Sequence, residues 1–281
     1  MRYDRDTDRA LDVLISLTGA DEAERVRERI GVVAARPAAR MPERWAAVRA
    51  LGDTAMPLSA RLWALEADDP KVNELVVLAG GLPGALELSV LKGEPFGPDG
   101  GRTLPRAGTL PARPTPPGVR RFAAPEEAVA ALREVRTMRQ GRRAANQLGR
   151  AHWPAVTAAD VERPLPGFAR WALALRPDCP GELRERFADH PSYAHRMRQG
   201  GIVADPAEYV RGWGPARSVL AVLDTGRWAF PHRMPEAEEV LRPLVRGSLG
   251  GSVEAWAVLA QLLPTFTGTV PELVVTAGAI A

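Results

Sequence analysis

Apolar residues recur along the chain at spacings of three and four, in short segments separated by prolines and glycines. After Pro125, for example, the apolar residues Ala128, Leu132, Val135 and Met138 follow one another at helical spacing. Such spacing places them on one side of a helix. No segment shows the sustained alternation of apolar and polar residues that a half-buried strand requires. We therefore predict an all-α fold, in which short helices stack into an α-solenoid-like repeat array.

Prolines and glycines indicate where the helices begin and end. Proline fits the first turn of a helix, and glycine commonly ends one. Gly141 is expected to divide the helical pattern after Pro125 into two pieces, and the stretch TGRWAFPHRM is expected to be less regular. The predicted helices start near Thr7, Asp21, Pro42, Pro57, Pro70, Pro83 and Pro125, and then cover residues near 153–162, 166–175, 180–188, 191–199, 205–211, 215–224, 235–246, 252–262 and 270–278.

The helical pattern is interrupted once over a long stretch. Residues 93–122 contain seven prolines and almost no periodicity. Structureless segments of this length are uncommon inside a compact domain. We predict an N-terminal helical half at 1–92, a Pro/Gly/Arg-rich linker or arm at 93–123, and a C-terminal helical half at 124–281. Whether the proline-rich segment separates the halves or lies along a surface is left open.

Two stretches of the chain resemble each other at a constant shift. The shift aligns Trp45 with Trp153 and Trp63 with Trp171 without a gap, and it yields ten identities over residues 45–83. Each copy has a helix with Trp-Ala, a turn, and a helix with Glu-Leu. Repeated units of this kind bury their apolar sides against one another. The predicted repeat core is Trp45, Trp63, Trp153, Trp171, Leu75 and Leu183.

A family resemblance accompanies the repeat. Its residues between Arg176 and Arg196 are Pro177, Cys179-Pro180, Leu183, Ala188 and Pro191, with comparable residues at Val72, Ala79, Leu82-Pro83 and Leu88. About 60 of the 281 residues thus resemble the leucine-rich-repeat-variant class, which is related in shape to HEAT-type solenoids. The resemblance implies a curved helical scaffold without catalytic residues. The iron–sulfur association of some relatives needs a cysteine cluster, which this chain lacks.

Composition indicates an ordinary soluble protein. Hydrophobic residues make up 46% and charged residues 25% of the chain, as in typical globular domains. The single cysteine, Cys179, excludes an internal disulfide and favours a reducing compartment; we expect it to be buried and inert. No apolar run approaches the roughly 18 residues that span a bilayer, and no secretory signal is evident. We therefore expect a cytoplasmic protein that is not bound in a membrane.

Positive charge is concentrated in one segment. Residues 97–150 contain eleven arginines against four acidic residues, whereas the whole chain carries only +3. Arg136, Arg139 and Arg143 are expected to share a helix face, which could neutralise phosphates. The alternative is a solvated face beside a basic linker. The candidate polyanion-binding residues are Arg133, Arg136, Arg139, Arg142, Arg143 and Arg150.

Motifs for chemistry are few. His190 and His195 lie five apart, which does not suit a metal pair on a helix, and their spacing from Cys179 matches no familiar zinc site. No nucleophile elbow, phosphate-binding loop or dinucleotide fingerprint occurs. We predict no metal, no cofactor and no catalytic residues.

Three functions are carried forward. The leading hypothesis is a non-catalytic helical-repeat scaffold that binds a protein or peptide partner. The alternative is a nucleic-acid-binding protein that uses the arginine-rich segment 97–150. The third is a HEAT-like DNA base-excision enzyme, in which Trp153, Trp171 and Asp160 would form the site; packing of these tryptophans between repeats is favoured over it.

Overall fold

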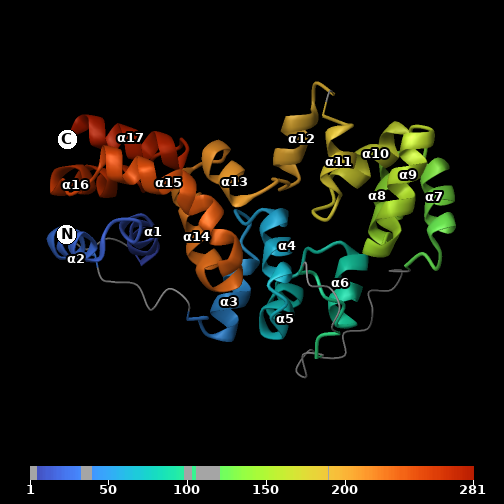
Figure 1. The fold of residues 1–281 in the computed structure, drawn as a ribbon, viewed down its shortest axis with the longest axis horizontal. Helices are drawn as coiled ribbons and strands as arrows, with labels where there is room; N and C mark the ends of the chain where they lie inside the picture. The colour runs from blue at the N-terminus through green and yellow to red at the C-terminus, as the bar shows by residue number, and fades with distance from the viewer. Residues whose placement is uncertain (1–4, 33–39, 98–102, 106–120, 189) are drawn as a thin grey trace. The chain divides into compact units, whose positions relative to one another are not determined.

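The computed structural model describes residues 5–32, 40–97, 103–105, 121–188 and 190–281, and every regular element in these ranges is a helix (Figure 1). The prediction of an all-α fold is therefore confirmed. The stacking of the helices as a solenoid stays a prediction.

The helices pack into two compact units, and one of them is built from both ends of the chain. The first unit consists of Met1–Met56 together with Ala204–Ala281, and the second is Pro57–Val203. The described residues of the segment 93–123, which is predicted to join two halves, lie inside the second unit, so the boundaries between the units fall elsewhere in the chain. A loss of periodicity marks an interruption of helix; it does not report which helices pack together.

The first unit joins segments that are far apart in the sequence. Within it α1 packs against α14, α2 against α16, and α15 against both α13 and α17. The helices of this unit are α1 (Arg5–Ile15), α2 (Ala20–Ile30), α3 (Arg44–Leu51), α13 (Pro206–Gly212), α14 (Ala216–Ala229), α15 (Met234–Ser248), α16 (Val253–Leu262) and α17 (Val270–Ile280), with the 3-10 turn η2 (Pro231–Arg233).

A buried carboxylate connects the two parts of the first unit. Asp12 of α1 is only 5% exposed. Its Oδ1 accepts a hydrogen bond from Arg27 of α2 at 2.8 Å, and its Oδ2 accepts one from Arg227 of α14 at 2.9 Å. Charge-assisted hydrogen bonds are stronger than neutral ones, so this carboxylate ties the N-terminal helices to the C-terminal part of the chain.

The second unit is continuous in sequence. Its core includes the fully buried Leu132, Leu148, Val156, Leu173 and Leu183. The most extensive helix contact of this unit is between α8 and α10, and α8 also packs against α6 and α7. The helices are α4 (Leu58–Glu66), α5 (Pro70–Ala79), α6 (Gly84–Leu91), α7 (Pro125–Arg133), α8 (Met138–Gln147), α9 (Trp153–Glu162), α10 (Gly167–Ala174), α11 (Gly181–Glu185) and α12 (Tyr193–Gln199), with the 3-10 turn η1 (Arg150–His152) before α9.

The first and last residues of the second unit lie next to each other. The Ser59 amide donates to the Gly201 carbonyl at 3.1 Å, and the Val203 amide donates to the Ser59 hydroxyl at 3.0 Å. Ser59 itself is buried. The chain therefore enters and leaves this unit at one place.

The helical pattern after Pro125 breaks at a different residue from the one predicted. α7 ends at Arg133, and Thr137 starts α8 with a capping box in which Thr137 and Gln140 bond each other's backbone N–H groups. Such a box satisfies donors that a helix start leaves open. Gly141 lies inside α8 and does not divide it.

The stretch TGRWAFPHRM is also more regular than predicted. Its first five residues continue α14 to Ala229. Gly226 lies in this helix, where an added Cβ would come within 2.4 Å of the Phe230 ring. Gly226 is therefore a packing position inside the helix.

The predicted repeat core is only partly buried. Trp63, Leu75, Leu183 and Trp153 are between 0% and 6% exposed, and Trp171 is half-buried. Trp45 is 71% exposed, so its assignment to the core is wrong. In α3 the buried side is formed by Ala47 and Leu51, and a residue two positions from Ala47 points to the other side of a helix.

Candidate functional site

Two of the candidate arginines bind backbone carbonyls. The Arg133 guanidinium donates to the carbonyl of Ala159 at 2.6 Å and also to that of Arg163. Arg150 donates to the Pro95 carbonyl at 2.7 Å, and its guanidinium lies 4.8 Å from the centre of the Phe96 ring. Both side chains thus connect loops to helices, and they are not available as a phosphate-binding face.

The other candidate arginines are exposed. Arg136 precedes α8, and its guanidinium donates to the Arg133 and Val135 carbonyls at 3.0 and 3.2 Å. It does not share a helix face with Arg139 and Arg143, because the helix starts only after the Thr137 cap. Three arginines do lie on α8, and their guanidinium groups form no ion pair or hydrogen bond with any residue that the structure describes. These are Arg139, Arg142 and Arg143, which we call the α8 arginine face.

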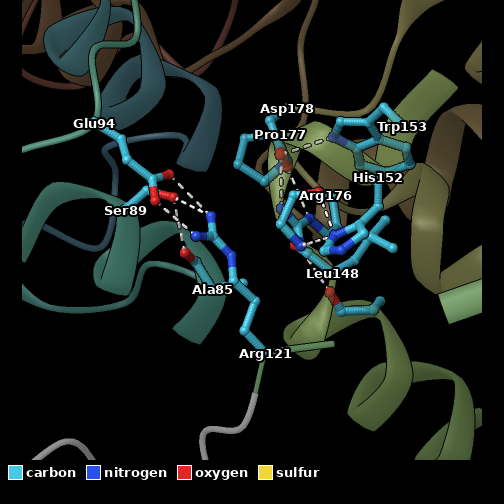
Figure 2. A network of polar contacts seen from close by, with 12 residues as sticks. Ala85, Ser89, Glu94, Arg121, Leu148, His152, Trp153, Arg176, Pro177 and Asp178 are labelled. Carbon is cyan, nitrogen blue, oxygen red and sulfur yellow. Dashed lines mark hydrogen bonds and ion pairs between the residues drawn. The ribbon is translucent and has the colours of Figure 1, made fainter. Parts of the chain in front are cut away.

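Arg176 is at the centre of a buried polar network (Figure 2). Its guanidinium forms a two-pronged ion pair with Asp178, at 2.8 and 2.6 Å, in which both side chains are less than 5% exposed. It also donates to the carbonyls of Ala145 and Leu148 at the end of α8. The Trp153 indole N–H donates to Asp178 at 2.9 Å. This network fixes the turn after α10 against α8 and α9.

A second ion pair joins the two ends of the proline-rich segment, Glu94 and Arg121. Arg121 donates to both oxygens of Glu94, at 2.7 and 3.0 Å, and to the Ser89 hydroxyl at 2.7 Å (Figure 2). The hydrogen bonds from Arg121, only partly offset by burial, lower the pKa of the Glu94 carboxyl to about 2. The same pair raises the pKa of Arg121. Both groups therefore stay charged at neutral pH.

The two ends of this segment are held in the second unit. Phe96 and Phe122 are both buried. The amides of Phe96 and Gly97 donate to the Asp68 carboxylate at 2.7 and 3.0 Å. Residues 93–97 and 121–122 thus behave as part of a folded unit, while 98–102 and 106–120, with most of the predicted arm, lie outside the described residues.

An apolar hollow of about 570 Å³ lies between α9 and α11. It is lined by Trp153, Pro154, Thr157, Ala158, Val161, Glu162, Pro180 and Glu182. Val161, one residue before the end of α9, is 60% exposed in the wall of this hollow. The lining contains two carboxylates and no basic side chain.

The residue spacing of α9 contains a sign of this hollow. Val156 and Asp160 mark the buried side of α9. Trp153, which is also buried, lies at intervals of four from Thr157 and Val161, and all three border the hollow. An apolar residue such as Val161 beyond the buried side of a helix indicates further contact surface.

The three residues of the base-excision hypothesis do not form an open site. Asp160 is completely buried, and its Oδ1 accepts a hydrogen bond from the Leu165 amide at 2.8 Å. Arg170 and Arg186 flank its carboxylate at 3.6 and 3.4 Å. A carboxylate without exposed surface cannot contact an extruded base.

The tryptophans of that hypothesis also have structural partners. The Trp153 ring packs beside Arg176. Trp171 lies edge-on to His190, with ring centres 4.8 Å apart, and the Arg196 guanidinium lies over its ring at 4.2 Å. Both rings are engaged within the second unit.

Other reactive groups are few among the described residues. Burial raises the pKa of the Cys179 thiol to about 12, so it stays protonated. The Gly149 amide donates to His152 Nδ1 at 2.9 Å. Within the described ranges, no group of three or more histidine, cysteine or acidic residues is arranged to hold a metal ion. The helices of those ranges also include none with the length and apolarity needed to cross a membrane.

Comparison with known proteins identifies no match for this chain. No protein-family model, curated protein or solved structure matches this chain. The leucine-rich-repeat-variant resemblance therefore stays a prediction.

Proposed function

We propose that the protein is a non-catalytic helical scaffold, and that the hollow between α9 and α11 receives an apolar side chain of a protein or peptide partner. The observation that carries the proposal is the hollow itself, with Val161 exposed in its wall. Contiguous exposed apolar surface commonly marks an interaction site. The hollow is open to solvent, and its volume is sufficient for an aromatic or branched side chain to lie against its apolar wall.

The charges around the hollow narrow the class of partner. Glu162 and Glu182 line it. A partner whose apolar anchor is flanked by lysine or arginine would place those cations beside the two carboxylates. Complementary charge of this kind contributes to specificity and to the rate of association.

The walls of the hollow are well supported. Trp153 is held by its hydrogen bond to Asp178, and Asp178 is held by Arg176. Pro180 follows directly after this network, at the start of α11. A binding surface on residues with fixed side chains loses less conformational entropy on association.

A peptide-display selection tests the proposal. The purified protein should enrich peptides that combine a large apolar residue with adjacent lysine or arginine. Burying one such anchor contributes about 1.5–3 kcal/mol. Val161→Glu would place a charge against it and should weaken binding by roughly tenfold or more.

The matched control is Val275→Glu. Val275 is 50% exposed on α17, in the other unit, so it tests the same substitution away from the hollow. Enriched peptides should bind this variant as they bind the parent protein. Equal binding by the Val161→Glu variant, or the absence of any enriched peptide class, would contradict the proposal.

A further inference from the structure

Trp45 of α3 is the most exposed large apolar side chain in the part of the chain that the structure describes. It is 71% exposed, whereas the buried side of α3 is formed by Ala47 and Leu51. Burying an aromatic side chain removes about 150–250 Å² from water, and an exposed ring forgoes that hydrophobic gain. Tryptophan is also enriched among the residues that contribute most to binding at protein–protein interfaces. Trp45 therefore has the exposure and the chemistry of an interface anchor.

Exposed arginines flank Trp45. Arg44 precedes it directly, and Arg49 follows it by four positions, a spacing that makes two residues neighbours on a helix surface. The Arg49 guanidinium forms no ion pair or hydrogen bond with any described residue. The nearest acidic residue in the sequence, Glu43, is the N-cap residue of α3 and precedes its helical turns. α3 thus presents a large apolar ring with positive charge beside it.

The hollow between α9 and α11 has complementary properties. Its lining is apolar apart from Thr157 and the two carboxylates of Glu162 and Glu182. Both glutamates are exposed, and neither carboxylate forms an ion pair with a described residue. An indole N–H that leaves water needs a hydrogen-bond acceptor, and a carboxylate at the edge of the hollow can supply one. The charges and the apolar surface of the Trp45 region and of the hollow therefore match.

The other exposed large apolar residues of the described ranges match the hollow less well. Val275 and Ile280 lie on α17, which contains no lysine or arginine. Phe168 lies two residues before Arg170, but the guanidinium of Arg170 is held 3.6 Å from a buried carboxylate. Among these residues, only Trp45 combines exposed apolar surface with an arginine whose guanidinium has no described partner.

We propose that the protein binds a second copy of itself, with Trp45 of one copy in the hollow of the next. This arrangement, which rests on the function proposed for the hollow and names its occupant, brings Arg44 and Arg49 near Glu162 and Glu182. Trp45 belongs to the first unit and the hollow to the second, so the contact joins two different surfaces. Such contacts form rings where the geometry closes and open chains where it does not.

Sedimentation velocity of the full-length protein, from micromolar to sub-millimolar concentration, tests the proposal. The parent protein should self-associate, and its affinity should fall as salt is added, because salt screens exposed charges. Trp45→Ala should weaken self-association by roughly thirtyfold, the effect of losing a buried aromatic anchor. Val161→Glu should weaken it by about tenfold or more. Both residues are exposed, and circular dichroism verifies that each variant is folded.

Two control variants separate the anchor and its charge from general effects of the surface. Phe168→Ala removes another exposed ring, and Arg142→Glu reverses a charge on the α8 arginine face. Both proteins should self-associate as the parent does. Arg49→Glu, in contrast, should weaken self-association by roughly fivefold, because it places a carboxylate near those of the hollow.

Mixing two variants identifies the surfaces as each other's partners. The Trp45→Ala protein keeps its hollow, and the Val161→Glu protein keeps Trp45. Each protein alone should stay monomeric at concentrations at which the parent associates. Their equimolar mixture should form a heterodimer, because one intact ring and one intact hollow are then available to each pair of molecules.

Three results would overturn the proposal: a parent protein that stays monomeric over the whole range, unchanged association of the Trp45→Ala variant, and a mixture that forms no heterodimer. Peptide selection on the Trp45→Ala variant distinguishes this failure from that of the proposed function. Peptides that bind this variant and lose affinity on Val161→Glu, with a monomeric parent protein, would show that the hollow receives a different protein. The absence of both peptide binding and self-association would remove the hollow as a binding site.

Discussion

Arg176 shows how the surroundings of a single residue decide what an arginine does in this protein. Its charge is neutralised by Asp178, and its remaining donors reach the last carbonyls of α8. A buried pair of this kind adds little net stability when intact, but loss of one partner leaves an uncompensated charge in the interior.

Arg176→Met is therefore expected to destabilise the protein by about 3–5 kcal/mol. Asp178 would lose its counter-charge, and the Ala145 and Leu148 carbonyls would lose their donor. The measurement is the free energy of unfolding from urea titration. Arg242→Met is the control, since Arg242 pairs with Glu238 at a site where both side chains are more than a third exposed, and its cost should stay below about 1 kcal/mol.

Glu94 gives the protein a pH-dependent contribution to stability. The pKa of this carboxyl falls from 4.5 to about 2 on folding. A lowered pKa means that the stabilisation is present above the unfolded value of 4.5 and is lost as the pH falls through about 2. Because the Glu94 side chain is 37% exposed, solvent screening reduces this contribution to the free energy of unfolding to about 1 kcal/mol.

Glu94→Gln should therefore lower the free energy of unfolding by about 1 kcal/mol at pH 7. The difference from the parent protein should shrink as the pH falls below 4.5 and become small near pH 2, where about half of the Glu94 carboxyl is protonated. Urea titrations at the two pH values measure it. Glu239→Gln, at an exposed position, controls for the loss of one carboxylate. A difference that persists unchanged at low pH would show that the ion pair with Arg121 is not its source.

At the scale of single residues, the sequence shows where the arginines are concentrated but does not show which groups their side chains contact. The local excess of arginine between 97 and 150 is visible directly, yet Arg133, Arg150 and Arg139 have different roles. The first two bind carbonyls 26 and 55 residues away. Contacts over such distances depend on the tertiary fold, which local spacing does not report.

The contact between α8 and α10 depends on a missing side chain. An added Cβ at Gly141 would lie 2.5 Å from the Phe168 carbonyl oxygen and 3.2 Å from the Ala172 Cβ. Glycine is normally unfavourable inside a helix by roughly 0.5–1 kcal/mol relative to alanine. Its presence in the middle of α8 is explained by the close approach of the two helices.

Alanine substitutions at two helical glycines should consequently have opposite signs. Gly141→Ala should destabilise the protein by about 1–3 kcal/mol, because backbone atoms must move to admit the methyl group. Gly247→Ala should stabilise it by about 0.5–1 kcal/mol, because that glycine lies in α15 with no atom within 4 Å of the added Cβ. Thermal and urea unfolding of both variants measure the signs; stabilisation by Gly141→Ala would refute the proposed close contact.

At the scale of elements, local chemistry was sufficient for most helix positions. Asp69 caps α5 and Pro70 opens it, where the sequence predicts a helix start. Thr269 caps α17, which lies where the last helix is predicted. The prediction failed where glycine serves packing and not termination, at Gly141 and Gly226. The hollow is not predicted by the sequence, because the apolar spacing of α9 indicates its buried side and not where Pro180 and Glu182 lie.

The division of the whole molecule into two units cannot be derived from the pattern of apolar and polar residues. The first unit depends on contacts such as Asp12 with Arg227, more than two hundred residues apart. The proline-rich segment is the most conspicuous break in the sequence, yet its ends are bound inside the second unit by Glu94 and Arg121. A break in periodicity and a boundary between compact units are thus independent features.

This division predicts that the second unit folds by itself. Residues 57–203 have their own core, and Ser59 bonds to Gly201 and Val203, so excision cuts the chain at two points that lie side by side. We expect this fragment to unfold cooperatively. We also expect the remaining chain to fold when a short Gly-Ser linker joins Met56 to Ala204, because the distance to be bridged between these two residues is small. The comparison is a fragment that begins after the proline-rich segment and contains residues 124–281. It lacks Asp12, the partner of Arg227, and it lacks Arg121, so we expect it to have no cooperative unfolding transition.

Calorimetry on the three proteins distinguishes these outcomes. Cooperative unfolding of 124–281 alone would show that the predicted halves, and not the two observed units, are the folding units.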